Sequence, residues 1–330
     1  MAPAYPERLS LAHTPTPLQP LDRLSRELGG PRIWLKRDDL TGATLTGNKI
    51  RKLEFSLAQA LAEGCDAVIT CGGLQSNHCR ATALLCAQLG LRCHLILRGK
   101  PDGPADGNLL LDQLAGASIS YREPAEYRQR LPELFDETQQ WYARQGLRAF
   151  AIPTGASDGI GVWGYVAASE ELGRDFAAQG ISPAHILCAT GSGGTQAGLV
   201  AGNQLFDLGA QVWGVNVCDD EAWFQRKVRE DLVDWNTRYS LQLPVEDWPI
   251  GVIDGYVGPG YGRADRAVFD TIRRLAEREG VVLDPVYTGK AMRGLIDQLR
   301  QGRFRGADDI VFIHTGGVFG LFPQRLELAL

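Results

Sequence analysis

The sequence predicts an α/β protein with two open, mostly parallel β-sheets flanked by helices, and a cleft between the sheets. Short β-rich runs alternate with stretches of helical periodicity, which is the pattern of repeated β-α units. A length of 330 residues is enough for two domains or one large α/β unit. In such sheets the loops beyond the carboxyl ends of the strands bind ligands, so these loops hold the candidate site.

The first half of the chain shows this alternation clearly. Apolar residues at Ile50, Leu53, Leu57 and Leu61 form one helical stripe over 48–64, which ends at a glycine. The predicted elements that follow are a strand over 67–71, a helix over 78–89, a strand over 93–97, a helix over 107–114, a strand over 118–121 and a polar surface helix over 126–145.

A second series of elements begins after residue 153. The further strands are predicted over 185–189, 211–218, 281–283 and 309–314. A glycine-rich turn follows the first of them and leads into a helix of small residues. Proline and glycine interrupt the segment 235–262 repeatedly, and we expect it to be an irregular surface excursion.

Composition and charge exclude several classes of protein. Hydrophobic residues make up 44% and charged residues 22%, as in ordinary globular proteins. The net charge of -5 argues against a nucleic-acid partner, and the absence of a run of eighteen apolar residues argues against a membrane span. The first twenty residues lack the unbroken apolar core of a signal peptide. We therefore expect a cytoplasmic protein that acts on a small molecule.

The seven cysteines do not indicate a metal site. Five of them (Cys65, Cys71, Cys79, Cys86 and Cys93) lie in one stretch, without a CxxC pair or any other zinc-ligand spacing. An odd number in a chain without a signal segment is typical of reduced, mostly buried thiols. We expect structural cysteines and no metal.

A basic cluster stands where the first helix begins. Lys49, Arg51 and Lys52 put three cations at a helix start, where the helix dipole favours anions. One interpretation is a solvated basic turn. The other is that Lys49 is a covalent amine, and that Lys52 or the helix end holds an anion.

A second loop has the chemistry of a phosphate cradle. Between a predicted strand and a helix stand Thr190, Gly191, Ser192, Gly193, Gly194 and Thr195. Glycines let the backbone close on an anion, and the helix start supplies free N–H groups. The loop is neither a Walker A motif nor a regular GxGxxG, so a dinucleotide is the weaker interpretation and a phosphate is favoured over a plain tight turn.

A third loop carries Gln75, Ser76, Asn77 and His78 at the start of a helix. Ser76 alone is explained as a helix N-cap. The two amides and the imidazole beside it are not needed for capping, and together they predict a nest for a carboxylate.

A lysine at a helix start and a separate phosphate cradle together indicate pyridoxal phosphate, a phosphorylated aldehyde. Four motifs carry a resemblance to a known family: GNKIRKLEF from Gly47, QSNH from Gln75, GSGGT from Gly191 and DPVYTGK from Asp284. The chain resembles the D-cysteine desulfhydrase and 1-aminocyclopropane-1-carboxylate (ACC) deaminase family. The resemblance implies the tryptophan-synthase-β-like fold type II of pyridoxal-phosphate enzymes, and a homodimer. It further implies a large domain over 1–48 and 162–330, with a small domain over 49–161 that closes over the cleft.

The resemblance also assigns roles. It implies that Lys49 binds the cofactor aldehyde covalently and acts as the base at Cα of the substrate. It places Gln75, Ser76, Asn77 and His78 at the substrate carboxylate, with Asn77 also near the cofactor's phenolic oxygen. It implies that the cofactor phosphate is bound by Lys52, Thr190, Gly191, Ser192, Gly193, Gly194 and Thr195.

Four further residues bear on which reaction is run. Tyr261 and Tyr287 match the family's two active-site tyrosines, with the alternative that Tyr287 is a packed aromatic with a satisfied hydroxyl. The resemblance implies that ACC deaminases carry Glu at the position of Thr288 and Leu at that of Thr315. A hydroxyl cannot hold a protonated ring nitrogen as a carboxylate does, so expulsion of a good β leaving group is favoured.

The reaction predicted is therefore α,β-elimination from D-cysteine, which gives pyruvate, ammonia and hydrogen sulfide. Cysteate sulfo-lyase activity and ACC deamination to 2-oxobutyrate and ammonia are the alternatives within the family. Ala81 and the segment 317–322 differ from the pattern that the resemblance suggests, and both concern the wall of the pocket. From other classes, a catalytically silent pyridoxal-phosphate binder and a nucleotide-dependent dehydrogenase stay open.

Overall fold

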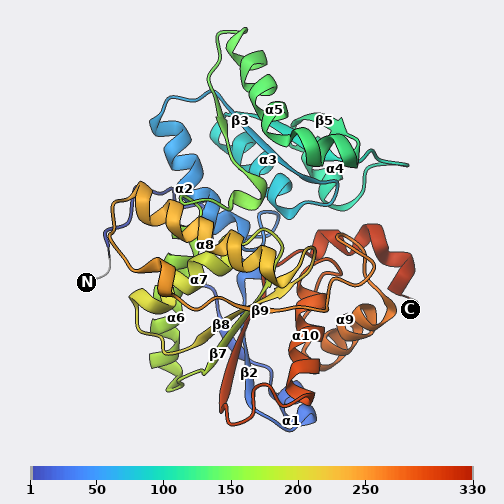
Figure 1. Ribbon diagram of the computed structural model, residues 1–330. Helices are drawn as coiled ribbons and strands as arrows, with labels where there is room; N and C mark the ends of the chain where they lie inside the picture. The colour runs from blue at the N-terminus through green and yellow to red at the C-terminus, as the bar shows by residue number, and fades with distance from the viewer. Residues whose placement is uncertain (1–2, 329–330) are drawn as a thin grey trace.

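The structure, a computed structural model, describes residues 3–328 and contains two β-sheets (Figure 1). The larger sheet has the strand order β1-β2-β10-β7-β8-β9, and only β1 runs antiparallel to its neighbour. Its strands are β1 (Leu18–Pro20), β2 (Arg32–Lys36), β7 (His185–Thr190), β8 (Gln211–Asn216), β9 (Gly251–Ile253) and β10 (Asp309–Ile313). The smaller sheet is parallel throughout, with the order β5-β4-β3-β6. Its strands are β3 (Ala67–Gly73), β4 (Arg92–Arg98), β5 (Ser118–Arg122) and β6 (Ala149–Ala151).

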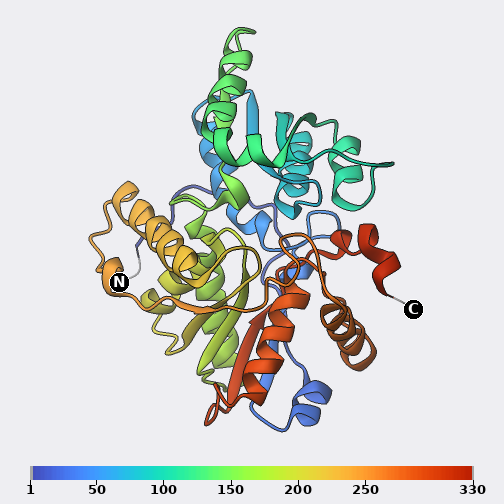
Figure 2. The same ribbon diagram turned by 45° about the vertical axis from the view of Figure 1, so that its right-hand side comes forward.

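Helices connect the parallel strands and cover the sheets. They are α1 (Asp22–Leu28), α2 (Lys49–Ala62), α3 (Asn77–Leu89), α4 (Gly107–Leu114), α5 (Pro124–Ala143), α6 (Val162–Gln179), α7 (Gly194–Leu205), α8 (Glu221–Arg238), α9 (Arg266–Glu279) and α10 (Thr288–Arg300). The helices α3, α4 and α5 belong to the smaller sheet, which stands above the larger one in both views (Figures 1 and 2). No helix within residues 3–328 is long and apolar enough to cross a membrane.

The larger sheet is buried on both faces. Along β7, Ile186 and Cys188 point into a core shared with α6, α7 and α8, while Leu187 and Ala189 point into a second core shared with α1, α9 and α10. Successive residues of a strand face opposite sides, so a strand covered on both sides is apolar without interruption. This is why the continuous run at 185–189 is a central strand.

The sequence-based prediction of two parallel sheets flanked by helices is confirmed, but two segments differ from it. The run 281–283 is not a strand: the two sides of β10 are already paired with β2 and β7, and the Val282 carbonyl accepts from the His314 imidazole instead. The segment 235–262 is less irregular than expected, because α8 continues to Arg238 and β9 adds a strand beside β8.

Candidate active site

A cavity of about 590 Å³ lies where the carboxyl ends of the two sheets meet. Its wall comes from loops that follow β3, β4, β6, β7, β8, β9 and β10, and from residues of the helices α2, α5 and α8. Open α/β sheets bind ligands at this edge because every parallel strand delivers its following loop there. The predicted site residues that line it are Lys49, Ser76, Asn77, His78, Thr190, Gly191, Ser192, Gly193, Thr195, Tyr261, Tyr287 and Thr315.

Lys49 is the first residue of α2 and its side chain reaches the cavity. Removal of the amine from water lowers the pKa of Lys49 to about 8. Gly155 allows the close approach: its φ is +68°, and a β-carbon there would lie 2.9 Å from the lysine Nζ and still closer to the Ser192 Oγ. The amine and the glycine loop therefore approach the same point from two sides.

The other cations of this turn are buried, which excludes the solvated basic turn. Arg51 donates to Asp38 and Glu171 in a buried ion-pair network that ties α2 to the turn after β2 and to α6. Lys52 is fully buried, and its Nζ donates to the Ser157 Oγ at 3.3 Å. Burial, and then the charge of Lys49, hold the pKa of Lys52 well below its usual range. An added anion would stabilise this ammonium.

The glycine loop joins β7 to α7 and has the features of an oxyanion site. The Ser157 Oγ donates to the Ser192 Oγ at 2.8 Å and accepts from the backbone N–H of Gly194 at 3.1 Å. The hydroxyl of Thr190 is buried without a partner among residues 3–328. A β-carbon on Gly194 would lie 2.8 Å from the Ser157 Oγ and 3.0 Å from the Lys52 Nζ, so only glycine leaves room between these two groups. Hydroxyls, a helix N-terminus and an ammonium converge, and they fit a phosphate.

The loop after β3 begins α3. The Ser76 Oγ accepts from the backbone N–H of Cys79 at 3.2 Å, so this residue is a helix N-cap and also lines the cavity. The Asn77 Oδ1 accepts from the Asn108 Nδ2 at 3.0 Å, which directs the rest of the amide. Burial holds the pKa of His78 well below its usual range, so its imidazole is neutral, with Nε2 2.8 Å from the Thr70 hydroxyl.

Gln75 and Thr288 do not line the cavity. The Gln75 amide donates to the Asp106 carbonyl at 2.9 Å and accepts from the backbone N–H of Asn108 at 2.9 Å, which fixes the start of α4. The Thr288 hydroxyl donates to the Asp284 Oδ1 at 2.7 Å inside the first turn of α10, and it is fully buried. Both side chains form hydrogen bonds that stabilise the start of a helix.

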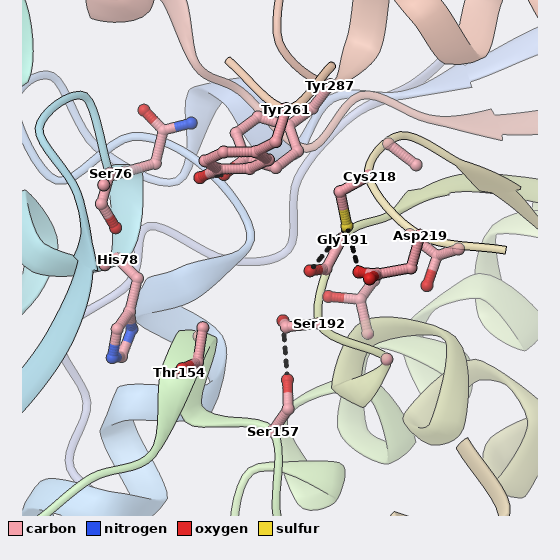
Figure 3. Close-up of a pocket in the computed structure, with 18 of the residues that line it drawn as sticks. Ser76, His78, Thr154, Ser157, Gly191, Ser192, Cys218, Asp219, Tyr261 and Tyr287 are labelled. Atoms are coloured by element: carbon pink, nitrogen blue, oxygen red, sulfur yellow. Dashed lines mark hydrogen bonds between the residues drawn. The ribbon is translucent and has the colours of Figure 1, made fainter. Parts of the chain in front are cut away.

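The two tyrosines lie side by side at one end of the cavity (Figure 3). Their hydroxyl oxygens are 2.5 Å apart. The Tyr287 ring packs on the glycine loop, since a β-carbon on Gly191 would lie 3.0 Å from its Cε1. Burial raises the pKa of both hydroxyls, so both are neutral in the working range of an enzyme.

Several residues of the site were not predicted from the sequence. Ser157 and Gly155 follow β6 in a short run of small residues, and the only sequence signal is that this run joins a strand to a helix. The Asn48 Nδ2 donates to the Thr195 Oγ1 at 2.8 Å and joins two of the predicted loops. Arg98 and Cys218 line the cavity from the ends of β4 and β8. The cysteines are free thiols, and all except the half-buried Cys218 are buried.

The chain matches the family described as "Pyridoxal-phosphate dependent enzyme" over residues 9–316. It is 42% identical to a protein of Thermotoga maritima named putative 1-aminocyclopropane-1-carboxylate deaminase, over 97% of this chain and 99% of that one. It is 39% identical to a D-cysteine desulfhydrase of Klebsiella pneumoniae, over 97% of both chains. A solved structure of an ACC deaminase homologue superposes with a TM-score of 0.87 at 36% identity, over 98% of this chain and 95% of that one.

Proposed function

The chain belongs to the pyridoxal-phosphate-dependent enzyme family, and from that premise we propose that it eliminates the β substituent of a small amino acid, with D-cysteine as the substrate. The reaction consumes one water and gives pyruvate, ammonia and hydrogen sulfide from each D-cysteine. The observation that carries the proposal is the cavity in which the Lys49 amine and the glycine loop meet around Gly155. Relatives named D-cysteine desulfhydrase, 38–40% identical to this chain, support this substrate.

The residues of the cavity fit pyridoxal phosphate. The phosphate would be held by the glycine loop, with Lys52 and Ser157 behind it, and the aldehyde would meet the Lys49 amine. The Tyr287 ring packs beside the same loop. When bound, the cofactor withdraws electrons from Cα of an attached amino acid and so makes the Cα proton acidic.

Lys49 is the base of this proposal. With an amino acid bound at the cofactor, the Lys49 amine would lie beside Cα and could take up the Cα proton. A pKa of about 8, against 10.5 for an ordinary lysine, gives an appreciable fraction of neutral amine near pH 7 to 8. The desolvation of Lys49 by the cavity is therefore part of the catalytic arrangement.

The loop at the start of α3 would receive the substrate carboxylate. The Ser76 hydroxyl, the Asn77 amide and the free N–H groups of the first turn of α3 face one region of the cavity. His78 is neutral and contributes polarity without a charge. These donors would fix the amino acid so that its Cα proton points to Lys49.

The ring nitrogen of the cofactor would meet no carboxylate from Thr288 or Thr315, the two positions that the sequence resemblance singles out. Thr315 lines the cavity with a neutral hydroxyl, and Thr288 is neutral and turned to Asp284. A weaker electron sink favours a substrate with a good leaving group, such as a thiol, over the ring opening of ACC. ACC deamination stays the second candidate because the relative that is 42% identical carries that name.

We extend the proposal to the assembly. We expect a cytoplasmic homodimer, in which the small domain over 49–161 closes on the large domain when substrate binds. Sedimentation analysis of the purified holoenzyme is expected to give about twice the chain mass of 36.0 kDa. A monomer at micromolar concentration would contradict the dimer without affecting the chemistry.

A substrate panel tests the reaction. Purified holoenzyme is incubated with D-cysteine, L-cysteine, β-chloro-D-alanine, cysteate and ACC, and the 2-oxo acid, ammonia and sulfur product are quantified. We expect equal amounts of pyruvate, ammonia and sulfide from D-cysteine. Faster release of 2-oxobutyrate from ACC would transfer the assignment to ACC deaminase, and no turnover of any β-substituted alanine would refute elimination.

A further inference from the structure

Arg98 is a cation of the cavity that has no role in the proposed chemistry. Arg98 is the last residue of β4, and in the parallel pairing it stands beside Gly73, the last residue of β3. The loop that carries Ser76 and Asn77 begins directly after Gly73. Arg98 is therefore next to the proposed carboxylate loop, on the same edge of the smaller sheet, and it lines the cavity.

Aromatic rings hold the Arg98 guanidinium in place. Its Cζ lies 4.8 Å from the ring centroid of Tyr261 and 5.8 Å from that of Tyr127. A β-carbon on Gly73 would lie 3.3 Å from the Tyr261 ring, so strand end, arginine and tyrosine form one packed unit. Stacking of this kind orients a guanidinium and leaves its N–H groups for a ligand.

The charge of Arg98 is not neutralised by the protein. Its guanidinium forms no ion pair with a carboxylate of residues 3–328, whereas Lys227, another cation of the wall, pairs with Asp231. Asp219 is the one carboxylate among the residues that line the cavity, and it is exposed. With Lys49 and Lys52 assigned to the cofactor, Arg98 and Arg128 are the cations of the wall that form no ion pair within residues 3–328. Arg128 is exposed, whereas Arg98 is half-buried, so Arg98 is the cation best placed for the substrate.

We propose that Arg98 is the binding site for the β substituent of the substrate, and that it takes up the negative charge that this substituent carries or gains on departure. This inference rests on the proposed function and names the class of substrate. It predicts β-substituted alanines whose substituent is an oxyanion, such as a sulfonate, or leaves as a basic anion, such as hydrosulfide.

The charge develops as the bond to the substituent breaks. Loss of the Cα proton to Lys49 supplies the electron pair that forms the Cα–Cβ double bond, and the pair of the Cβ–S bond goes to sulfur. A thiol is neutral when bound and leaves as hydrosulfide, whereas a sulfonate is charged throughout and leaves as sulfite. Chloride is a very weak base and leaves readily, so it needs the least help from a cation.

The test compares three substrates on the holoenzyme and on Arg98→Gln. Loss of a charge-assisted contact is expected to lower kcat/KM about ten- to a hundredfold for cysteate and D-cysteine, and less than about threefold for β-chloro-D-alanine. Arg98→Lys keeps the charge and is expected to restore part of the loss. Arg122→Gln is the matched control, because Arg122 stands beside Arg98 in the sheet but does not line the cavity.

Equal losses for all three substrates would show that Arg98 only holds Tyr261 or the α-carboxylate, and would overturn the proposal. So would unchanged kinetics. A second readout does not depend on turnover: isothermal titration of the holoenzyme with methanesulfonate is expected to show binding that Arg98→Gln weakens at least tenfold and Arg122→Gln leaves unchanged. If methanesulfonate binds through Arg98 but no substrate is turned over, the elimination reaction is wrong while the anion site stands.

Discussion

The hydroxyl oxygens of Tyr261 and Tyr287 lie 2.5 Å apart, one from the loop after β9 and the other from the residue that precedes α10. Such a short contact between two hydroxyls that burial keeps neutral requires one to donate and the other to accept. The pair therefore presents one remaining O–H to the cavity. Neither tyrosine can be assigned a role independently of its partner.

We expect Tyr261→Phe to lower kcat/KM for D-cysteine about tenfold, because Tyr287 loses the partner that orients its hydroxyl. The double variant with Tyr287→Phe should lose less than the sum of the single variants, with a coupling of about 1 kcal/mol. Tyr256→Phe is the control, since its hydroxyl accepts from Gln298 outside the cavity. Strictly additive losses would mean that the contact is not functional.

Lys49→Ala is expected to remove covalent attachment of pyridoxal phosphate. The variant should lose the visible absorbance band and incorporate no cofactor on borohydride reduction, while the intact glycine loop still allows weaker, reversible binding. The rate at which wild-type apoprotein takes up the cofactor should rise towards pH 8 and level off above it, because a lowered pKa leaves the amine neutral from about pH 8 upward. Covalent cofactor in Lys49→Ala would show that another lysine is the anchor; exposed Lys100→Ala is the control.

The parts of this site that the sequence predicted are those with a local physical signature. Cations at a helix start and a run of glycines between a strand and a helix are both unusual, and a ligand explains both. Ser157 has no such signature: it matters because the chain after β6 passes close to the glycine loop, and this approach is set by tertiary packing. Arg98 has no local signature either, because its place at the cavity depends on the pairing of β4 with β3.

The structure gives Gln75 a local role that its motif does not reveal. It belongs to a motif that predicts a carboxylate nest, yet its amide is used by Asp106 and Asn108 at the start of α4. The residues 281–283 favour extended backbone and so predict a strand, but a strand also needs a free sheet edge to pair with. The local sequence shows neither which residues a side chain will contact in the fold nor whether a sheet edge will be free for another strand.

Gly194→Ala is expected to weaken cofactor retention at least tenfold, because the new methyl group would stand where the Ser157 hydroxyl and the Lys52 ammonium meet. The measurement is the fraction of cofactor that remains after dialysis against phosphate-free buffer. Gly103→Ala is the matched control, since no atom lies within 4 Å of its added methyl group. Equal retention by the two variants would place the phosphate elsewhere.

Asp112→Asn is expected to change how stability depends on pH. Asp112 is buried in α4, both carboxylate oxygens lack a partner among residues 3–328, and burial raises its pKa to about 8 against the charge of Arg80. Because the folded state holds this proton more tightly than the unfolded state, whose pKa is 3.8, wild-type stability should fall as the pH rises from about 4 to 8.

The asparagine of the variant has no proton to lose. The unfolding free energy of the variant minus that of the wild type should therefore rise by up to about 1.4 kcal/mol per pH unit and level off above pH 8. Urea unfolding at pH 5, 6, 7 and 8 measures it, and groups that both proteins share cancel in the difference. Exposed Asp102→Asn should show no such trend. A constant difference between pH 5 and 8 would mean that Asp112 is ionised in the folded protein throughout, with its charge balanced by Arg80.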